Sequence, residues 1–307
     1  MLRYALGRLL AVVPTFLLIV AAAFFLMRAA PGGPFDAEQT LPPEIAANLQ
    51  AAYGLDQPVY IQFGRYLAGL AQGDLGPSFR MKDFTVAELI VRGLPVTLAV
   101  GGGALLLALA LGVPLGLAAG LRHNGWADHA VMAVALVGIA IPSFVVAPVL
   151  ALVFGLHLDW LPVAGWESGN LRYVVLPIVT LALPVAAYVA RLTRGSLLEV
   201  LQSAYIRTAR SKGLASGVVL RRHALKPTLL PVVSFLGPAA AGLLTGSLVV
   251  EQVFGLPGVG RYFVQGAVNR DYTLVMGMVI FYASLILLLN LLVDLLYGWL
   301  DPRIRHD

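Results

Sequence analysis

Long apolar runs alternate with short polar stretches along this chain. The first run, Leu9–Met27, is uncharged over 19 residues, and a helix of that length, roughly 28 Å, can cross the apolar core of a membrane. The same criterion predicts further crossings within Gly93–Leu121, Ala130–Leu156, Tyr173–Ala190, Thr228–Val250 and Tyr272–Val293. Prolines inside these runs are tolerated, because neighbouring helices of a bundle can satisfy the freed backbone groups. The pattern predicts an all-α polytopic membrane protein with six transmembrane helices.

The composition supports this class. Of 307 residues, 59% are hydrophobic and only 12% are charged, whereas soluble domains are about a quarter charged. The basic balance could suggest a nucleic-acid partner, but the apolar chain has no soluble domain left to bind one, so no nucleic acid is expected. The absence of cysteine excludes disulfides, cysteine-ligated zinc and thiol catalysis.

The distribution of Lys and Arg predicts the orientation. The segment 191–226 contains eight such residues against one acid, Glu199, and Arg3 and Arg8 precede the first crossing without an acid. The segment 30–91 instead contains three basic and seven acidic residues. Because basic residues accumulate on the cytoplasmic side, both termini and 191–226 are predicted to face the cytoplasm (N-in, C-in), which a cytoplasmic (inner) membrane protein of a bacterium would show.

Four regions follow from this topology. They are a first transmembrane helix (1–29), an external segment (30–92), a five-helix core with a cytoplasmic segment at 191–226 (93–299) and a cytoplasmic tail (300–307).

The external segment carries two patterns of short amphipathic helices. One places Ile45, Leu49 and Tyr53 on one face, and the other, after Pro58, forms a stripe of Tyr60, Phe63, Leu67 and Leu70. Two helices lying on the membrane surface or capping the bundle are expected; a docking surface is not implied by the pattern.

Catalytic and nucleotide-binding motifs are missing. No His-Glu-x-x-His zinc helix occurs, and none of the three lysines follows a glycine, which excludes a Walker-type phosphate loop. The stretch "GLPGVG" at 255–260 lacks that lysine and is interpreted as a turn. The chain is therefore predicted not to be an enzyme and to bind no cofactor or metal itself. An intramembrane hydrolase is disfavoured because no nucleophile and base can be assembled.

Two acids, Glu251 and Asp294, lie close to the hydrocarbon, each near the end of a crossing. Intramembrane acids can mark an ion path, but these two lack partner bases at helical spacing, so hydrogen bonding at helix interfaces is the preferred interpretation. A self-contained channel or ion-coupled carrier stays as an alternative from another class.

Small hydroxyl residues provide the interior polar groups. Ser143, Thr245 and Ser247 lie on central stretches of the third and fifth crossings. They could border a path for polar solutes, or they could bond helices to one another as such residues commonly do.

The stretch "AYIRTARSKG" (204–213) separates two crossings and predicts a helix. Tyr205, Ile206 and Ala209 share one face, while Arg207, Arg210 and Ser211 share another. Gly213 is placed to end this helix in the left-handed conformation. A second helix, Val218–Leu225, is predicted to stop before Pro227.

This segment resembles the cytoplasmic motif of ABC-importer permeases, which is Glu-Ala-Ala, three residues, Gly and an apolar-x-Leu-Pro ending. Arg207, Thr208 and Ala209 occupy the triplet, Gly213 the glycine and Leu225 the leucine. Arg207 replaces the glutamate, and Lys226 stands where the motif has proline. The form "YIRTARSKGL…HALKP" is that of the peptide and nickel branch.

Further stretches resemble the same branch over almost the whole chain. They are "APGGPF" (30–35), "YGLDQP" (53–58), "GDLGPSF" (73–79), "IPSFVVAP" (141–148), "ARLTRGSLLEVL" (190–201), "FGLPGVG" (254–260) and "NRDY" (269–272). Within the branch, the stretches "LPPEIAANLQAAYGL" and "GDLGPSFRMKDFTV" are most similar to the B-type membrane subunit of bacterial oligopeptide importers.

The resemblance implies a type I ABC importer permease fold and a role as half of a translocation pore. It implies a second, C-type permease, two cytoplasmic ATPase subunits that bind the ATP, an external peptide-binding protein and a peptide substrate. It also implies that the helix of Tyr205, Ile206, Arg207, Thr208, Ala209 and Arg210, ended by Gly213, couples to an ATPase, with Ala209 and Gly213 small enough for close docking. Dipeptide, glutathione and nickel import stay open as alternatives.

Overall fold

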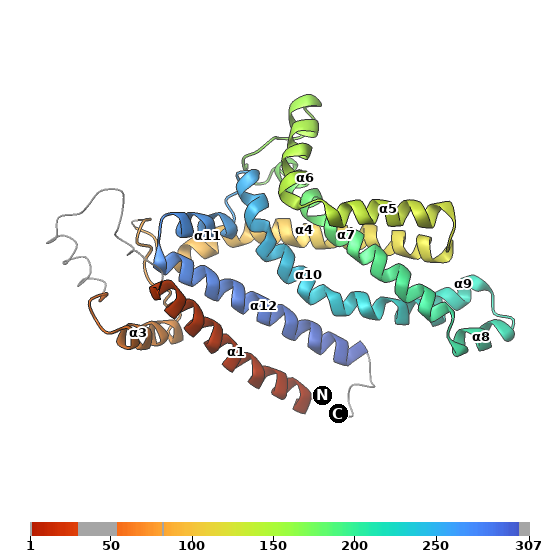
Figure 1. Cartoon of the computed structure of the whole chain (residues 1–307), viewed down its shortest axis with the longest axis horizontal. Helices are drawn as coiled ribbons and strands as arrows, with labels where there is room; N and C mark the ends of the chain where they lie inside the picture. Colours follow the sequence, from red (N-terminus) through yellow and green to blue (C-terminus); the bar gives the residue numbers. More distant parts are fainter. Residues whose placement is uncertain (1, 30–53, 82, 301–307) are drawn as a thin grey trace.

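The computed structural model describes residues 2–29, 54–81 and 83–300. Apart from an isolated bridge between Pro77 and Thr85, this part of the chain forms helices, turns and loops (Figure 1). The predicted helix with Ile45, Leu49 and Tyr53 lies outside the described residues. The helices are α1 (Leu2–Ala29), α3 (Val59–Ala71), α4 (Val86–Leu121), α5 (Trp126–Ala140), α6 (Ser143–Leu150), η1 (Ala151–His157), α7 (Arg172–Leu201), α8 (Ala204–Ser211), α9 (Ser216–Val219), η2 (Leu220–Ala224), α10 (Leu225–Val253), α11 (Val259–Val268) and α12 (Tyr272–Leu300).

The crossings match the predicted ones in number, with one difference in shape. Five helices of the described chain are long and apolar enough to cross a membrane, and a bent pair of helices makes a sixth crossing if it counts as one span. These helices contain the six predicted ranges. The five long helices all extend beyond the predicted ranges; α4, for example, begins at Val86 and α7 continues to Leu201.

The third predicted crossing, Ala130–Leu156, is not one straight helix, and this correction has a local cause. α5 and the α6–η1 pair meet at an angle of 101°. Pro142 disfavours the helical conformation of the residue before it, and Ile141 is accordingly extended, with φ −88° and ψ 120°. α6 and η1 therefore leave the line of α5 and project from the bundle (Figure 1).

The closest helix pair is α4 with α7, and glycines permit the approach. Gly112, Gly116 and Gly120 follow one another at four-residue spacing and are all buried. A methyl group added at Gly112 would lie 2.7 Å from the carbonyl oxygen of Ala186. Small residues at such spacing let the backbones of membrane helices pack closely, so α4 and α7 form one tightly joined unit.

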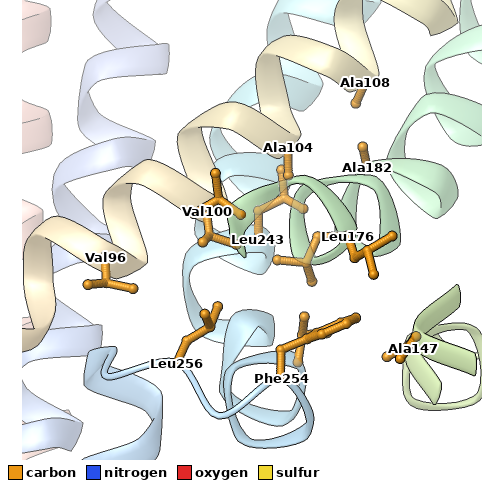
Figure 2. Packing of buried hydrophobic residues seen from close by; sticks show 14 of the residues in the cluster. Val96, Val100, Ala104, Ala108, Ala147, Leu176, Ala182, Leu243, Phe254 and Leu256 are labelled. Atoms are coloured by element: carbon orange, nitrogen blue, oxygen red, sulfur yellow. The ribbon is translucent and has the colours of Figure 1, made fainter. Parts of the chain in front are cut away.

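The largest apolar cluster lies between α4, α7 and α10. Figure 2 shows Val100 and Ala104 of α4 close to Leu176 of α7 and Leu243 of α10. Phe254 and Leu256, from the loop after α10, close this cluster at one end. Its members are nearly all aliphatic, which suits a core whose outer surface meets lipid rather than water.

The predicted helix after Pro58 is confirmed as α3, but its apolar stripe differs from the prediction. Phe63, Tyr66, Leu67 and Leu70 pack on α1 and α12. Tyr60 is instead 72% exposed, because it lies in the first turn and no described side chain covers it. In this partly buried stripe, Tyr66 takes the place that the sequence pattern predicts for Tyr60.

The connections between helices are sorted to the two ends of the bundle. Figure 1 shows α8, α9 and the turn between α4 and α5 at one end, and α3 and α11 at the other. This arrangement agrees with the side assignments that the Lys and Arg distribution predicts.

Candidate functional site

α8 (Ala204–Ser211) connects α7 to the helices that lead into α10, and it is anchored by two buried residues. Ile206 is fully buried and Ala209 is 6% exposed. Both pack in a cluster with Leu197, Val219 and Ala224. The helix is therefore held against the chain's own cytoplasmic core and is not a loose loop.

The end of α8 has the geometry predicted for Gly213. Its φ is +78°, and its N–H donates to the carbonyl of Arg210 at 2.9 Å. The N–H of Leu214 donates to the carbonyl of Ala209 at 3.4 Å, which completes a Schellman-type ending. A methyl group built on Gly213 would meet nothing within 4 Å, so glycine is needed here for its backbone conformation and not for space inside this chain.

The outer face of α8 differs from the predicted one in two residues. Tyr205 was grouped with the apolar face, but it is 48% exposed, since it lies one residue before Ile206 and turns away from the cluster. Ala209 was expected to allow docking by a partner, but it faces the chain's own core. Its small size serves packing within the chain.

Basic side chains surround this outer face. None of them forms an ion pair with a described residue, so their charge is available to a partner. The exposed bases are Arg207, Arg210, Lys212, Arg221, Arg222 and Lys226.

The second predicted helix does not stop before Pro227. α9 runs into a π-helical stretch, η2, and then directly into α10, which contains Pro227. Proline has no N–H to donate to the carbonyl four residues earlier, here that of His223, and the wider turn of η2 lies at this point. The helix changes its pitch where the sequence pattern predicted a break.

An ion pair that the sequence analysis missed lies close to this segment. Asp128, in the first turn of α5, is 1% exposed and accepts two hydrogen bonds from Arg194 of α7, at 2.5 and 2.8 Å. The N–H of Asn124 donates to the same carboxylate at 3.0 Å, and His123 Nδ1 lies 3.3 Å from it. Arg194 belongs to the stretch "ARLTRGSLLEVL" and was counted only as a topology signal. An acid in the first turn of a membrane helix was the available clue.

Glu251 is the acid that the sequence analysis assigned to hydrogen bonding, and the structure agrees. It is fully buried. Thr97 and Ser247 donate to Oε1 at 2.7 and 2.8 Å, and the N–H of Gly260 donates to Oε2 at 2.9 Å. The stretch 255–260 is confirmed as a turn that opens α11, and Glu251 satisfies backbone at that helix start. The side chain of Asp294 lies outside the described residues.

Two of the quoted stretches, "GDLGPSF" and "NRDY", meet at the same end of the bundle. Asp271, fully buried at the start of α12, accepts a hydrogen bond from the Ser78 hydroxyl. It also accepts from the N–H of Arg80 at 3.2 Å and from the N–H of Leu274 at 3.1 Å. The order of the external segment thus depends on a carboxylate nearly 200 residues away in the sequence.

The three hydroxyl residues lie in different surroundings. Ser247 is fully buried and bonded to Glu251, whereas Ser143 and Thr245 are partly exposed. Thr245 donates to the carbonyl of Ala241 at 2.8 Å and lines an apolar cavity of about 410 Å³. A solute path at these residues stays a prediction, and the hydrogen bond of Ser247 gives it a structural role.

Comparison with known families covers nearly the whole chain. Residues 1–101 match the family described as "Binding-prot-dependent transport system membrane comp, N-term". Residues 112–306 match "Binding-protein-dependent transport system inner membrane component". The chain belongs to this family. It is accordingly a multi-pass permease of the inner membrane and a transport subunit rather than an enzyme.

Individual relatives agree with this family membership. The chain is 49% identical over 306 residues to the oligopeptide transport system permease protein OppB of Salmonella typhimurium and to that of Escherichia coli, covering 100% of this permease and of each relative. It is 41% identical over 305 residues to the dipeptide transport system permease protein DppB of Bacillus subtilis, covering 99% and 98% of the two chains.

A solved structure supports the fold. A chain of the MetNI methionine ABC transporter, in an inward-facing conformation, matches with a TM-score of 0.57 and 20% identity, over 70% of this permease and 97% of that chain. This likeness shows the type I ABC importer permease fold that the sequence resemblance implies.

Proposed function

We propose that this permease is the B-type membrane subunit of an ATP-driven importer for oligopeptides and forms half of its translocation pore. The observation that carries the proposal is the 49% identity to two oligopeptide permeases over the full length of both chains. The identity to a dipeptide permease is lower, at 41%, so dipeptides are the second candidate substrate. Glutathione and nickel are further alternatives within the branch.

The proposed assembly contains three kinds of partner subunit. A related C-type permease would complete the pore, two cytoplasmic ATPase subunits would bind and hydrolyse ATP, and an external binding protein would deliver the peptide. The absence of a phosphate loop in this permease supports the assignment of ATP to separate subunits.

In this assembly, α8 is proposed as the contact with an ATPase subunit. Its inner residues Ile206 and Ala209 are held by the permease itself, while Tyr205, Arg207 and Arg210 are exposed on the other side. Large aromatic and arginine side chains are typical of residues that dominate binding at protein interfaces. A helix fixed on one face and basic on the other can transmit movement from a partner without changing its own fold.

The ion pair of Asp128 with Arg194 supports a route for this movement. α7 leads directly into α8 and packs closely on α4, and Arg194 ties it to the start of α5. α4, α5 and α7 would then move as one unit. α5 leads to the 101° bend, so displacement of α8 would reach the part of the crossing that leaves the bundle.

For the solute path, Ser143 at the bend and Thr245 are proposed as bordering residues, with Ser247 behind them. A tryptophan at position 143 is expected to lower uptake while leaving the abundance of the permease unchanged. Unchanged uptake would instead favour a packing role for these hydroxyls.

Uptake by the assembled importer tests the proposal. The permease would be co-expressed with the C-type permease, ATPases and binding protein of the same organism, purified as a complex and reconstituted into vesicles. ATP-dependent accumulation of labelled tetra- and pentapeptides, exceeding that of dipeptides, glutathione or nickel, is expected. Preferred uptake of one of the other solutes would replace the oligopeptide assignment. If no ATPase subunit co-purified with the permease, the proposal of an ATP-driven importer would be contradicted as a whole.

A further inference from the structure

A cleft of about 370 Å³ opens at the external end of the bundle, between the end of α1, helix α3 and the loop 73–79. Its volume lies in the range of ligand pockets, roughly 300–1,000 Å³. Apolar side chains of Phe24 and Leu75 line one part of it, and polar side chains of α1 and α3 line another. It shares no lining residue with α8 or with the predicted solute path.

Two polar groups of residues that line this cleft lack a hydrogen-bond partner among the described residues. The Tyr66 hydroxyl and Gln62 Oε1 are buried and unsatisfied. The guanidinium of Arg28 lies over the rings of Phe24 and Tyr272, at 5.1 and 5.9 Å from their centroids. Ring contacts engage the flat face of a guanidinium, so its N–H groups at the edge stay available in the described structure. Unsatisfied buried polar groups are costly, and two of them beside a guanidinium at one cleft indicate that something else bonds to them.

The groups are of two complementary kinds. Arg28 and Arg65 are cations, and burial raises the pKa of the Tyr66 hydroxyl, so it stays protonated and can donate. Gln62 supplies an acceptor. Its side-chain nitrogen donates to the carbonyls of Leu55 and Gln57, at 3.1 and 2.7 Å, and its Oε1 has no donor among the described residues. Donors and acceptors in one cleft suit a ligand with an anionic group and an N–H group.

An acidic side chain adds to the accepting side of the cleft. Asp74 Oδ1 accepts from the N–H of Gly76 at 2.8 Å, and its carboxylate lines the cleft. A carboxylate near an amide oxygen suits an ammonium group, which carries three N–H donors.

The position of the cleft selects the source of the ligand. Arg28 lies in the last turn of the first crossing, and apolar side chains beside it on α1 are partly uncovered, Phe25 being 45% and Leu26 73% exposed. Basic residues at the end of a membrane helix reach the headgroup layer, while exposed apolar residues of the same turn meet the acyl chains. A lipid seated here would place its headgroup in the cleft and its chains along α1.

We propose that this cleft binds the headgroup of a zwitterionic, amine-bearing phospholipid of the external leaflet, of the phosphoethanolamine type. Arg28, Arg65 and Tyr66 hold the phosphate, and Gln62 and Asp74 accept hydrogen bonds from the ammonium group. The bound lipid joins α3 to the end of α1 and so fixes the external segment against the membrane.

Lipid retention by the purified importer tests the site. Native mass spectrometry would compare the complex carrying Tyr66→Phe or Arg28→Gln with the wild-type complex. Tyr66→Phe removes one oxygen and is not expected to disturb folding. Losing a hydrogen bond to a charged group weakens binding roughly tenfold, so both variants should retain much less phosphatidylethanolamine. Tyr60→Phe on the exposed part of the same helix, and Arg92→Gln at the same end of the bundle, are matched controls and should retain the wild-type amount.

A comparison of three phospholipids identifies the headgroup that the cleft binds. Delipidated complex in nanodiscs should bind phosphatidylethanolamine in preference to phosphatidylglycerol, which lacks the ammonium, and to phosphatidylcholine, whose ammonium has no N–H. Equal retention in Tyr66→Phe and Tyr60→Phe, or no preference among the three lipids, would overturn the proposal. Displacement by soluble glycerophosphoethanolamine at equal concentration would assign the site to a dissolved zwitterion and would equally refute the lipid.

Discussion

α8 and α11 each connect two long membrane helices, at opposite ends of the bundle (Figure 1), but they treat polar groups in opposite ways. Around α11, the carboxylates of Glu251 and Asp271 are fully buried and hydrogen-bonded to side chains and backbone of the permease. Around α8, the buried residues are apolar, and the bases are exposed and form no ion pair within the described chain.

The two connections differ in which molecule provides partners for their polar and charged groups. The external one is completed within the chain, since Glu251 accepts its hydrogen bonds from Thr97, Ser247 and Gly260 of the permease itself. The cytoplasmic one leaves its charges to another molecule. Substitutions should therefore affect stability at α11 and, at the outer face of α8, transport.

The largest effect is expected from Glu251→Ala. This change leaves the hydroxyl of Thr97 and the N–H of Gly260 buried without their acceptor and opens a cavity, while Ser247 can still donate to the carbonyl of Leu244 at 3.0 Å. Each buried unsatisfied group costs about 1–3 kcal/mol, so the loss should exceed any other described here. Fluorescence-detected size-exclusion chromatography after heating would show a much lower melting temperature, whereas the exposed acid Glu199, changed to alanine, should have almost no effect. A wild-type melting temperature for Glu251→Ala would show that α11 is not held by this carboxylate.

Arg194→Ala should follow, because it leaves the carboxylate of Asp128 buried without its cation. Removing one partner of a buried ion pair costs roughly 3–5 kcal/mol. Arg191, three residues earlier and exposed, provides the control Arg191→Ala. If the pair also joins α5 to the movement of α7, Asp128→Asn should lower peptide uptake more than ATP hydrolysis in the reconstituted importer. An equal decrease in both rates would limit the pair to stability.

A third test separates the two faces of α8. Ala209→Trp inserts a large side chain into the cluster with Ile206 and Leu197, and overpacking costs about 1–3 kcal/mol, so lower abundance is expected. Arg210→Glu changes only an exposed charge and should leave abundance normal while weakening retention of the ATPase subunits. Normal ATPase retention in Arg210→Glu would remove α8's basic face from the proposed contact.

A small effect on stability is expected at Gly213. The Cβ that Gly213→Leu adds would meet no atom of the chain within 4 Å, so the main expected cost is that of a positive φ, about 1 kcal/mol. Abundance should be near normal, yet uptake should be lost because the side chain enters the proposed ATPase contact. At Gly258, by contrast, even a methyl group would overlap the carboxylate of Glu251, so Gly258→Ala should reduce folding. Normal uptake in Gly213→Leu would leave α8 with a purely topological role.

Regular patterns allowed most of the fold to be predicted from the sequence. Uncharged apolar runs predicted the crossings. A glycine directly after a short amphipathic pattern predicted the end of α8 at Gly213. The same periodicity placed Tyr205 on the wrong face, because an eight-residue helix has too few turns to define its phase. The bend at Ile141–Pro142 was missed since prolines elsewhere, such as Pro177 and Pro184, lie inside a continuous helix.

The polar interactions could not be predicted, because they join residues distant in the sequence. Asp128 meets Arg194, Thr97 meets Glu251 and Ser78 meets Asp271, and nothing in the local pattern pairs them. The candidate site was found only in part for the same reason. The exposed bases are visible in the sequence, but the burial of Ala209 depends on Leu197 and Val219, which other helices supply.

The π-helical turn η2 gives the two supports of α8 unequal stiffness. The half of α7 next to α8 contains no proline and is pinned to α5 by Arg194. On the other side, η2 interrupts the regular hydrogen-bond ladder between α9 and α10, and such turns are the compliant points of helices. A force on α8 is therefore transmitted through a regular helix on the α7 side and through an irregular helical turn on the α10 side. Such a force would rotate α8 about the end of α7 instead of displacing α7 and α10 equally.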